Sequence, residues 1–379
     1  MTEPVVLRGM TWDHSRGYDP MVATAEAFCA SRPGVSIVWE KRSLQAFADR
    51  PIGEMADTYD LMVIDHPHVG EVAGSGDLLA FDTLGRDDEL RALSRQSVGP
   101  SHCSYEFLGH QWALAIDAAT PVAAYRPDLI DLPPTAWQDV IDLAGKGRVA
   151  MALIPINALM TFFGLAANQD FVIAEDPDHL IDGEAGITVL EQMLALVSRI
   201  DARCLTLDPI GIYEWMSTEA DAPAYSPFGY GYTNYSRKGY RPHPIVFTDA
   251  PGIRPGDPTG TVIGGAGIAV SSRSAHRDIA ADYAFYVASA ECQSGLYFEA
   301  GGQPGNVAAW DSAVCNADCM NFFFNTRKTL ESSWLRPRYD GYMALQDRGG
   351  DIIHACLKGE VSAAAALEAL DAAYRETRK

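Results

Sequence analysis

Residues 5–20 have the sequence VVLRGMTWDHSRGYDP. The apolar run at 5–8 predicts a short strand, and Asp19-Pro20 predicts the cap and first residue of a following helix. In an open α/β sheet, ligands bind in the crevice beyond the carboxyl ends of the strands. The polar loop after this strand is therefore predicted to face a small molecule. Its predicted contact residues are Trp12, Asp13 and His14.

A second strand end repeats this arrangement. Residues 61–64 are apolar and predict a buried strand, and the chain turns polar directly afterwards at Asp65. A carboxylate after a buried strand is costly unless it has a partner, and a ligand is one such partner. The opposing interpretation is a turn organised by an Asx hydrogen bond and Pro67, with the imidazoles exposed. The candidate ligand contacts here are Asp65, His66 and His68.

The composition is that of a globular chain, and its 379 residues suggest about two or three domains. Hydrophobic residues at 47% and charged residues at 21% exclude a disordered or fibrous protein. No stretch approaches the roughly 20 apolar residues of a membrane-spanning helix. The formal net charge of -21 disfavours nucleic acid and anionic membranes, because affinity for phosphate depends on Lys and Arg. No nucleic-acid or membrane ligand is expected.

Seven cysteines without a zinc or framework spacing predict mostly reduced, buried thiols, and they favour a reducing compartment. The first residues, Met1-Thr2-Glu3-Pro4, contain no signal-peptide pattern. Two interpretations stay open. Either an export signal has been trimmed and replaced by Met, or the protein is not exported in the ordinary way.

The first third of the chain alternates between strand and helix patterns, which indicates a parallel sheet with helices on its faces. Two apolar runs, 113–116 and 122–125, predict strands that cross from one domain to the next. A helix at 136–144, a strand near 149–153 and helical spacing at 159–166 and 187–197 then predict a second α/β unit. The tail at 342–375 predicts two helices broken at Gly359, with Ser362 capping the second.

The segment 223–258 is rich in Tyr, Pro and Gly, which is too irregular for a long helix and too aromatic for a disordered linker. Its aromatic rings could line the wall of a ligand site, although ordinary packing is nearly as good an explanation. The candidate contacts in this segment are Tyr230 and Asn234. Further candidates elsewhere are Trp112, Asn157, Gly302 and Gln303, the last two in a Gly-rich turn at 301–305.

The sequence has no nucleophile elbow, P-loop, dinucleotide fingerprint or papain-like cysteine signature. Asp13 and Asp65 could form the carboxylate pair of a glycosidase. The histidines of the two loops could join these carboxylates on a transition metal, but the spacing is generic. No catalytic residue, metal or cofactor is expected.

Taken in order, several motifs resemble the extracellular solute-binding proteins of carbohydrate importers of the ATP-binding-cassette (ABC) type. The motifs are the strand and loop start at 60–65, the crossover at 112–128, the helix start at 134–137, the strand at 264–271, the turn at 301–305, and segments 336–339 and 362–367. The similarity covers nearly the whole chain. Each motif is weak, and the specificity comes from their order and spacing.

The resemblance implies an α/β periplasmic-binding-protein-like fold of type II, with two lobes that close on a ligand about hinge strands. The implied lobes are 1–117 with 261–310 and 118–260 with 311–379, and the hinge lies near 113–125 and 258–262. The implied function is that of a periplasmic or extracellular, monomeric substrate-binding component, which takes a carbohydrate, polyol or related small polar solute to the membrane subunits of an ABC transporter. Two alternatives stay open. They are a metal- or small-anion-binding protein on the same fold, and a carbohydrate-active enzyme using Asp13 and Asp65.

Overall fold

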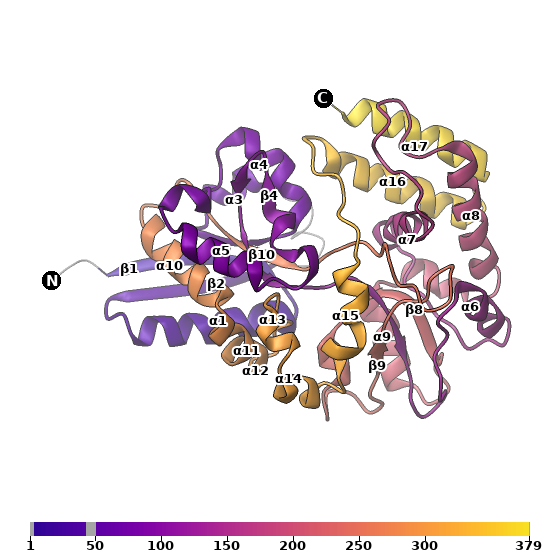
Figure 1. Ribbon diagram of the computed structural model, residues 1–379, viewed down its shortest axis with the longest axis horizontal. Helices are drawn as coiled ribbons and strands as arrows, with labels where there is room; N and C mark the ends of the chain where they lie inside the picture. Colours follow the sequence, from indigo (N-terminus) through magenta and orange to yellow (C-terminus); the bar gives the residue numbers. More distant parts are fainter. Residues whose placement is uncertain (1–3, 43–50, 379) are drawn as a thin grey trace. The chain divides into compact units, whose positions relative to one another are not determined.

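The computed structural model describes residues 4–42 and 51–378. The chain forms two compact units. Unit 1 consists of residues 1–119 and 264–316, and unit 2 consists of residues 120–263 and 317–379. The chain therefore passes from one unit to the other at 119/120, 263/264 and 316/317 (Figure 1).

A five-stranded sheet with the order β2-β1-β3-β10-β6 forms the centre of unit 1. Its strands are β1 (Val5–Trp12), β2 (Val35–Arg42), β3 (Leu61–Ile64), β6 (Leu114–Asp117) and β10 (Ala266–Val270). The predicted parallel pairing is confirmed for β1 with β2 and β3, but β10 is antiparallel to β3 and β6. The antiparallel direction of β10 follows from the point at which the chain re-enters unit 1. Ala266 pairs with Asp117 at the carboxyl end of β6, so β10 can only run back along its neighbours.

Helices α1 (Ser15–Ala30) and α10 (Arg277–Ala288) pack on this sheet and on each other (Figure 1). Phe28 of α1 meets Tyr283 of α10 edge to face, with 5.2 Å between the ring centroids. Trp39 of β2 lies over Gly9 of β1, where an added Cβ would come within 2.6 Å of the indole. The apolar runs that predicted β1 and β3 thus contribute to the core beneath these helices.

Shorter elements complete unit 1. They are α3 (Ile52–Ala56), η1 (His66–His68), α4 (Val69–Ser75), η2 (Phe81–Leu84), α5 (Asp87–Arg95), η3 (Gly99–Ser101), η4 (Cys103–Tyr105), β4 (Glu106–Phe107), β5 (His110–Gln111), α11 (Ala290–Ser294), α12 (Leu296–Glu299) and α13 (Val307–Trp310). Helix α14 (Ala313–Asp318) contains the passage at 316/317.

Unit 2 has a three-stranded antiparallel sheet with the order β8-β7-β9. Its strands are β7 (Pro121–Tyr125), β8 (Tyr225–Tyr230) and β9 (Val246–Thr248). The Tyr-rich segment therefore contributes two strands to the core of unit 2. The predicted strand near 149–153 is wrong, because only Val149 forms a bridge, with Tyr225, and the N–H of Leu153 donates to the carbonyl of Cys204 instead.

The helices of unit 2 are α6 (Trp137–Ala144), α7 (Pro155–Asn168), α8 (Gly183–Val197), η5 (Ala202–Thr206), α9 (Pro209–Thr218), η6 (Thr233–Ser236), α15 (Phe322–Glu331), α16 (Tyr342–Leu357) and α17 (Ala363–Thr377). They include the predicted ones, α6, α7, α8, α16 and α17, and two longer ones that were not predicted, α9 and α15. The break at Gly359 is confirmed by its φ of 76°, and the Ser362 hydroxyl caps α17 by accepting from the N–H of Ala365. None of the helices in the described part of the chain combines the length and the apolar content needed to cross a membrane.

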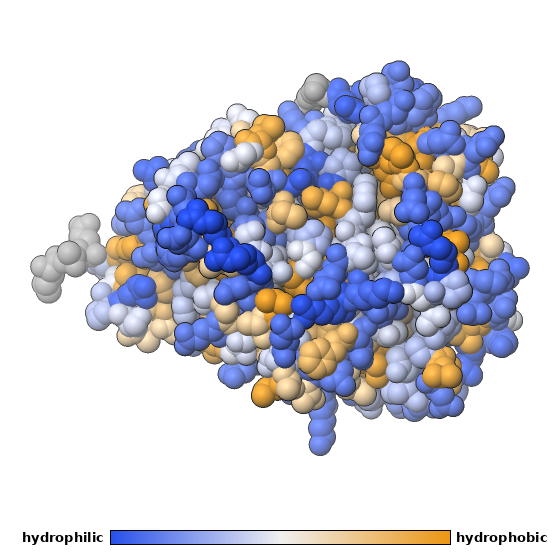
Figure 2. Space-filling model, in the orientation of Figure 1, coloured by the Kyte–Doolittle hydropathy of each residue, from blue (hydrophilic) through white to orange (hydrophobic). Residues whose placement is uncertain are grey.

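The face drawn in Figure 2 is mostly hydrophilic, with apolar side chains in small patches. Most of the cysteine side chains are buried, as predicted. Cys204, Cys292, Cys315, Cys319 and Cys356 are buried, Cys29 is half-buried and Cys103 is exposed. Burial raises the pKa of Cys292 to about 12, so that thiol stays protonated at neutral pH.

Candidate functional site

Three strands of unit 1 end at the same edge of its sheet. Met10 of β1 is in register with Met62 of β3, so the two parallel strands end together, at Trp12 and Ile64. Gly267 of β10 pairs with Ile64, and Ala266 pairs with Asp117, which brings the end of β6 to this edge as well. The two loops singled out in the sequence thus follow neighbouring strand ends, where an α/β sheet presents side chains to ligands.

Two of the three predicted contacts in the first loop have structural roles. His14, not Asp19, caps α1, because its Nδ1 accepts a hydrogen bond of 3.0 Å from the N–H of Arg16. The predicted start of the helix at Pro20 is therefore wrong by about one turn. Trp12 is only 6% exposed and packs on α1, where a Cβ at Gly17 would lie 2.3 Å from the indole. Little of the predicted aromatic face remains for a ligand.

Asp13 is the exposed member of this loop. Its carboxylate forms an ion pair of 2.7 Å with Lys41 of β2, and both side chains are about half exposed, at 53% and 49%. The hydrogen bond with Asp13 raises the pKa of Lys41. The pair offers one acceptor group and one donor group to a polar ligand.

The second loop buries its histidines. His66 and His68 are 0% and 4% exposed, so the interpretation of this loop as a turn with exposed imidazoles is wrong. The ring of His66 lies edge-on to Tyr105, and Nδ1 of His68 lies 3.9 Å from a carboxylate oxygen of Glu71. Asp65 is half-buried and its carbonyl accepts from the N–H of His68. Asp65 is thus the least buried of the three predicted contacts in this loop.

A buried ion pair lies at the same edge and was missed in the sequence. The guanidinium of Arg16 binds the Asp117 carboxylate through two hydrogen bonds, of 2.8 Å from Nε to Oδ2 and 2.5 Å from Nη2 to Oδ1. The side chains are 4% and 1% exposed. Burial raises the pKa of Asp117, and Arg16 opposes that shift. One signal was available, because Asp117 is the one charged residue in the apolar stretch 113–125.

The Gly-rich turn packs beside this ion pair. Gln303 is fully buried, and its side-chain amide donates to the carbonyl of Ala118 at 2.9 Å. Pro304 forms a bridge with Asp117. A Cβ at Gly302 would lie 2.3 Å from the ring of Tyr297, so this position accepts only glycine. Gln303 thus supports the chain just after β6, and Gly302 packs against Tyr297 of α12.

Trp112 has a structural role in the β4–β5 hairpin. Its indole N–H donates to the carbonyl of Phe107 at 3.0 Å, and its ring meets His110 at 5.4 Å between centroids. The side chain is 6% exposed. This arrangement explains the residue without a ligand.

In unit 2, Tyr230 is half-buried at the end of β8. It lies close enough to Tyr342 to influence the pKa of Tyr342, which is raised mainly by burial. Arg336 opposes that shift and donates 2.6 Å from Nη1 to Oε1 of Gln346. Tyr230, Arg336, Tyr342 and Gln346 therefore form one polar cluster, in which Tyr342 is fully buried.

The two predicted asparagines of unit 2 are nearly buried. Asn157 is 8% exposed in the first turn of α7. Asn234 is 4% exposed in η6, and its Oδ1 accepts no hydrogen bond from any described residue. A buried acceptor of this kind is suited to a donor supplied by a ligand or a water molecule.

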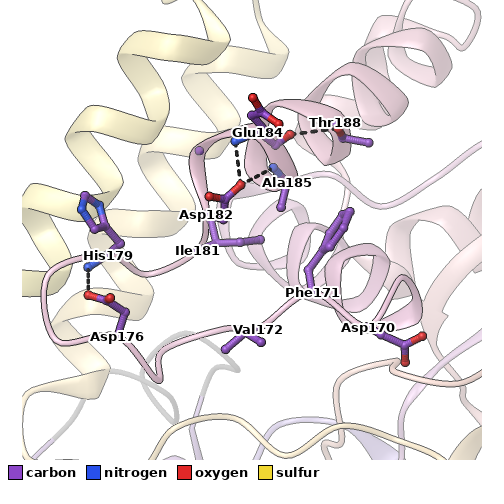
Figure 3. A pocket seen from close by; sticks show the side chains of 11 residues that line it. Asp170, Phe171, Val172, Asp176, His179, Ile181, Asp182, Glu184, Ala185 and Thr188 are labelled. Carbon is purple, nitrogen blue, oxygen red and sulfur yellow. Dashed lines mark hydrogen bonds between the residues drawn. The ribbon is translucent and has the colours of Figure 1, made fainter.

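A cavity of about 720 Å³ lies in the surface of unit 2 and contains none of the predicted contacts. It is lined by Asp170, Phe171, Val172, Asp176, His179, Ile181, Asp182, Gly183, Glu184, Ala185 and Thr188 (Figure 3). Asp182 caps α8 by accepting from the N–H groups of Glu184 and Ala185, and Asp176 accepts from the N–H of His179. These two carboxylates are engaged in holding the loop.

Metal ligands do not gather within residues 4–42 and 51–378. No group of three or more His, Cys, Asp or Glu side chains there could hold a metal ion. The five loop residues considered for a transition metal are thus not arranged around a common point.

Comparison with known proteins gives matches to solved structures alone. No protein-family model and no curated protein matches the chain. Maltose-bound MalE3 of T. maritima is 14% identical, with 98% of this chain and 99% of that chain covered and a TM-score of 0.81. A solute-binding protein of an ABC transporter from Agrobacterium radiobacter K84, in complex with ribitol, is 18% identical, with 99% of each chain covered and a TM-score of 0.82.

A third match is the cyclic alpha-maltosyl-1,6-maltose binding protein of Arthrobacter globiformis, at 17% identity, 99% coverage of each chain and a TM-score of 0.77. The similarity extends over nearly the whole length of every chain compared. The predicted α/β periplasmic-binding-protein fold is therefore confirmed.

Proposed function

We propose that this chain is the substrate-binding component of an ABC importer and that it binds a carbohydrate, a polyol or a related small polar solute outside the cytoplasmic membrane. The observation that carries the proposal is the shared fold over 98% to 99% of the chain, since the matched proteins are described with maltose, ribitol and a cyclic maltosyl-maltose. The solute binds reversibly to one protein molecule and is released unchanged to the membrane subunits.

The polar groups at the strand ends of unit 1 suit a neutral ligand. Asp13 and Lys41 form a pair of opposite charge with both side chains about half exposed, so this edge offers a donor and an acceptor with little net charge. Sugar hydroxyl groups donate and accept at the same time, and charged partners make the stronger hydrogen bonds. Asp65, which is half-buried, adds a second carboxylate. We assign the hydrogen bonding of hydroxyl groups to these residues.

Unit 2 supplies the complementary chemistry. Tyr230 presents an amphipathic ring at the end of β8, and aromatic rings cover the apolar faces of sugars while leaving their hydroxyl groups to polar neighbours. Asn157 and Asn234 contribute amide groups. Substitution in each unit tests the contribution of its residues to affinity separately.

The enzyme alternative is less well supported by the geometry. A glycosidase needs one carboxyl group held protonated by an apolar environment as a general acid. Asp13 is about half exposed and is paired with Lys41. Binding without turnover is therefore the better account of this carboxylate.

The test is a thermal-shift screen followed by calorimetry. Maltose, maltotriose, ribitol and tagatose are compared with organic acids and divalent metal ions, because a ligand that binds only the folded state raises the melting temperature. A sugar or polyol that binds with a stoichiometry of about one supports the proposal, and its recovery unchanged after incubation excludes turnover. Stabilisation by metal ions or organic acids alone, or consumption of the sugar, would reject it.

A further inference from the structure

Three arginine side chains in the described part of the chain are buried, and one of them lacks a counter-charge. Arg16 is 3% exposed and is paired with Asp117. Arg126 is 1% exposed and is paired with Asp128. Arg336 of unit 2 is 6% exposed, and it forms no ion pair with any residue that the structure describes. A buried charge without a partner is strongly unfavourable, so this guanidinium is suited to an anionic group from outside the chain.

The open side of the Arg336 guanidinium includes the atom that binds the carboxylate in the other two arginines. Arg16 and Arg126 each hold their carboxylate through Nε and Nη2. In Arg336 it is Nη1 that is engaged, because it donates 2.6 Å to Oε1 of Gln346, which is a neutral side chain. The buried Nε of Arg336 has no hydrogen-bond partner among the described residues. The edge that matches the two oxygens of one acid group is thus left for a ligand.

The neighbours of Arg336 leave its charge in place. Tyr342 is fully buried beside it, and burial raises the pKa of Tyr342, so the phenol stays neutral. The hydroxyl of Tyr342 has no hydrogen-bond partner of normal geometry among the described residues, and a phenol can donate to an acid group. Tyr230, already proposed as the ring contact of unit 2, lies close to Tyr342. The charge is therefore next to a residue assigned to ligand binding.

The charge balance favours a carboxylate over a phosphate. One guanidinium neutralises one carboxylate, whereas a phosphate monoester carries up to about two negative charges at neutral pH. Among the buried arginines of the described residues, Arg336 alone has a charge that is not already paired. The chain also has a formal net charge of -21, so a second negative charge on the ligand would stay uncompensated.

We propose that the solute carries a carboxylate that binds Arg336, so that the ligand is a sugar acid, either an aldonate or a uronate. This proposal rests on the proposed function and deepens it by naming the substrate class. The carboxylate accepts from Nε of Arg336 and from the phenol of Tyr342. The hydroxyl groups of the ligand stay with the residues already proposed for them.

Calorimetry with matched pairs of ligands tests the class. Glucuronate is compared with glucose, ribonate with ribitol, and maltobionate with maltitol, because each acid has a carboxylate where its partner has a hydroxymethyl group. At least one acid is expected to bind tenfold or more tightly than its neutral partner, as a charge-assisted hydrogen bond to a buried guanidinium requires. Glucose phosphorylated at its primary hydroxyl group is the phosphate arm, and it should bind more weakly than glucuronate.

Two substitutions separate a binding role from a structural one. Arg336→Gln removes the charge and should bring the affinity ratio of acid to neutral partner to about one. Gln346→Glu places a carboxylate 2.6 Å from Nη1, so the chain then supplies the counter-charge itself. The ligand-free variant should melt about 2 °C or more above the unchanged protein, and its preference for the acid should fall at least fivefold. Arg348→Gln is the control, since it removes an arginine of α16 that is 47% exposed, and it should keep the preference.

The outcomes distinguish this proposal from the proposed function. If a neutral sugar binds but no acid binds more tightly than its partner, the carboxylate assignment is overturned and the proposed function stands. The same holds if Arg336→Gln and Gln346→Glu leave the preference unchanged, or if the phosphate arm binds more tightly than glucuronate. Binding of sugar acids alone supports both proposals, because these acids are carbohydrates. Absence of binding by every sugar, polyol and sugar acid rejects the proposed function and this assignment together.

Discussion

Arg16 and Asp117 are 101 positions apart in the chain, yet they form a bidentate ion pair with both side chains almost completely buried. A buried pair of this kind adds little net stability, since desolvation of both charges opposes their attraction. Removing one partner is nevertheless destabilising, because the remaining charge is then buried with neither water nor an ion-pair partner. The pair sits at the end of β6, two residues before the passage to unit 2 at 119/120. The pair therefore couples the end of β6 to α1, and substitution of either residue is expected to change stability.

Replacing Asp117 with Asn is expected to destabilise the protein by about 3 kcal/mol, because it leaves the guanidinium of Arg16 buried and unpaired. The free energy of unfolding is measured by urea denaturation. The control is Asp88→Asn, at a side chain that is 98% exposed, and it should leave stability unchanged. A double replacement, Arg16→Met with Asp117→Leu, should recover most of the stability, because it removes both buried charges together. A double variant no more stable than Asp117→Asn would contradict this account of the pair.

The fold could be predicted largely from the sequence, because its signals are local. The apolar run at β3 and the Gly359 break depend on residues close together in the chain, and both are confirmed. The antiparallel direction of β10 was not predictable in this way. It depends on where the chain re-enters unit 1 after 144 residues of unit 2, which no local pattern records. The predicted hinge positions stay predictions.

The sequence predicted the location of the candidate site better than the role of each side chain in it. The loops after β1 and β3 do follow neighbouring strand ends, as expected of a sheet. The role of each side chain depends on contacts with distant residues, such as Trp12 with α1, or Gln303 with Ala118. Asp117 was not predicted as a site residue because it lies inside an apolar run, although burying a carboxylate there is costly and therefore informative. The predicted ligand contacts stay predictions.

Gly265 and Gly34 give a matched pair of substitutions. Both have a φ of +88°, but a Cβ at Gly265 would lie 2.3 Å from the carbonyl oxygen of Asp117, whereas a Cβ at Gly34 meets nothing within 4 Å. Gly34→Ala is therefore expected to cost about 1 kcal/mol from backbone strain alone. Gly265→Ala adds a clash with backbone that cannot move aside, so its cost should be at least about 3 kcal/mol. Urea denaturation of both variants measures the difference, and equal costs would show that β6 yields at Asp117.

His102 predicts the pH dependence of stability. Burial lowers its pKa to about 4 from the ordinary value of 6.5, so the unfolded chain binds a proton more readily than the folded one. Its contribution to stability is complete above pH 6.5 and is lost as the pH falls towards 4, by up to about 3 kcal/mol. His102→Gln should flatten the stability profile in that range, as measured by urea denaturation between pH 4 and pH 7.

His179 provides the control of opposite sign. It is exposed, and its hydrogen bond of 2.7 Å with Asp371 raises its pKa. Its contribution is present at low pH and is lost as the pH rises through the raised value. His179→Gln should therefore steepen the loss of stability on acidification, whereas His102→Gln reduces it. Parallel profiles for the two variants would contradict both assignments.

Tyr230→Ala tests the contribution of unit 2 to ligand binding. Tyr230 is half-buried at the end of β8, so truncation should affect the fold less than the ligand. We expect the affinity for the sugar identified in the screen to fall about tenfold, which corresponds to about 1.4 kcal/mol of lost contact with the ring. Tyr240→Ala is the matched control, because Tyr240 is also half-buried in the Tyr-rich segment but stacks on Arg241, 4.4 Å from its ring centroid. Calorimetry measures the affinity of both variants for the sugar. Equal losses of affinity would indicate a general effect on the segment, and no loss for Tyr230→Ala would remove this ring from the site.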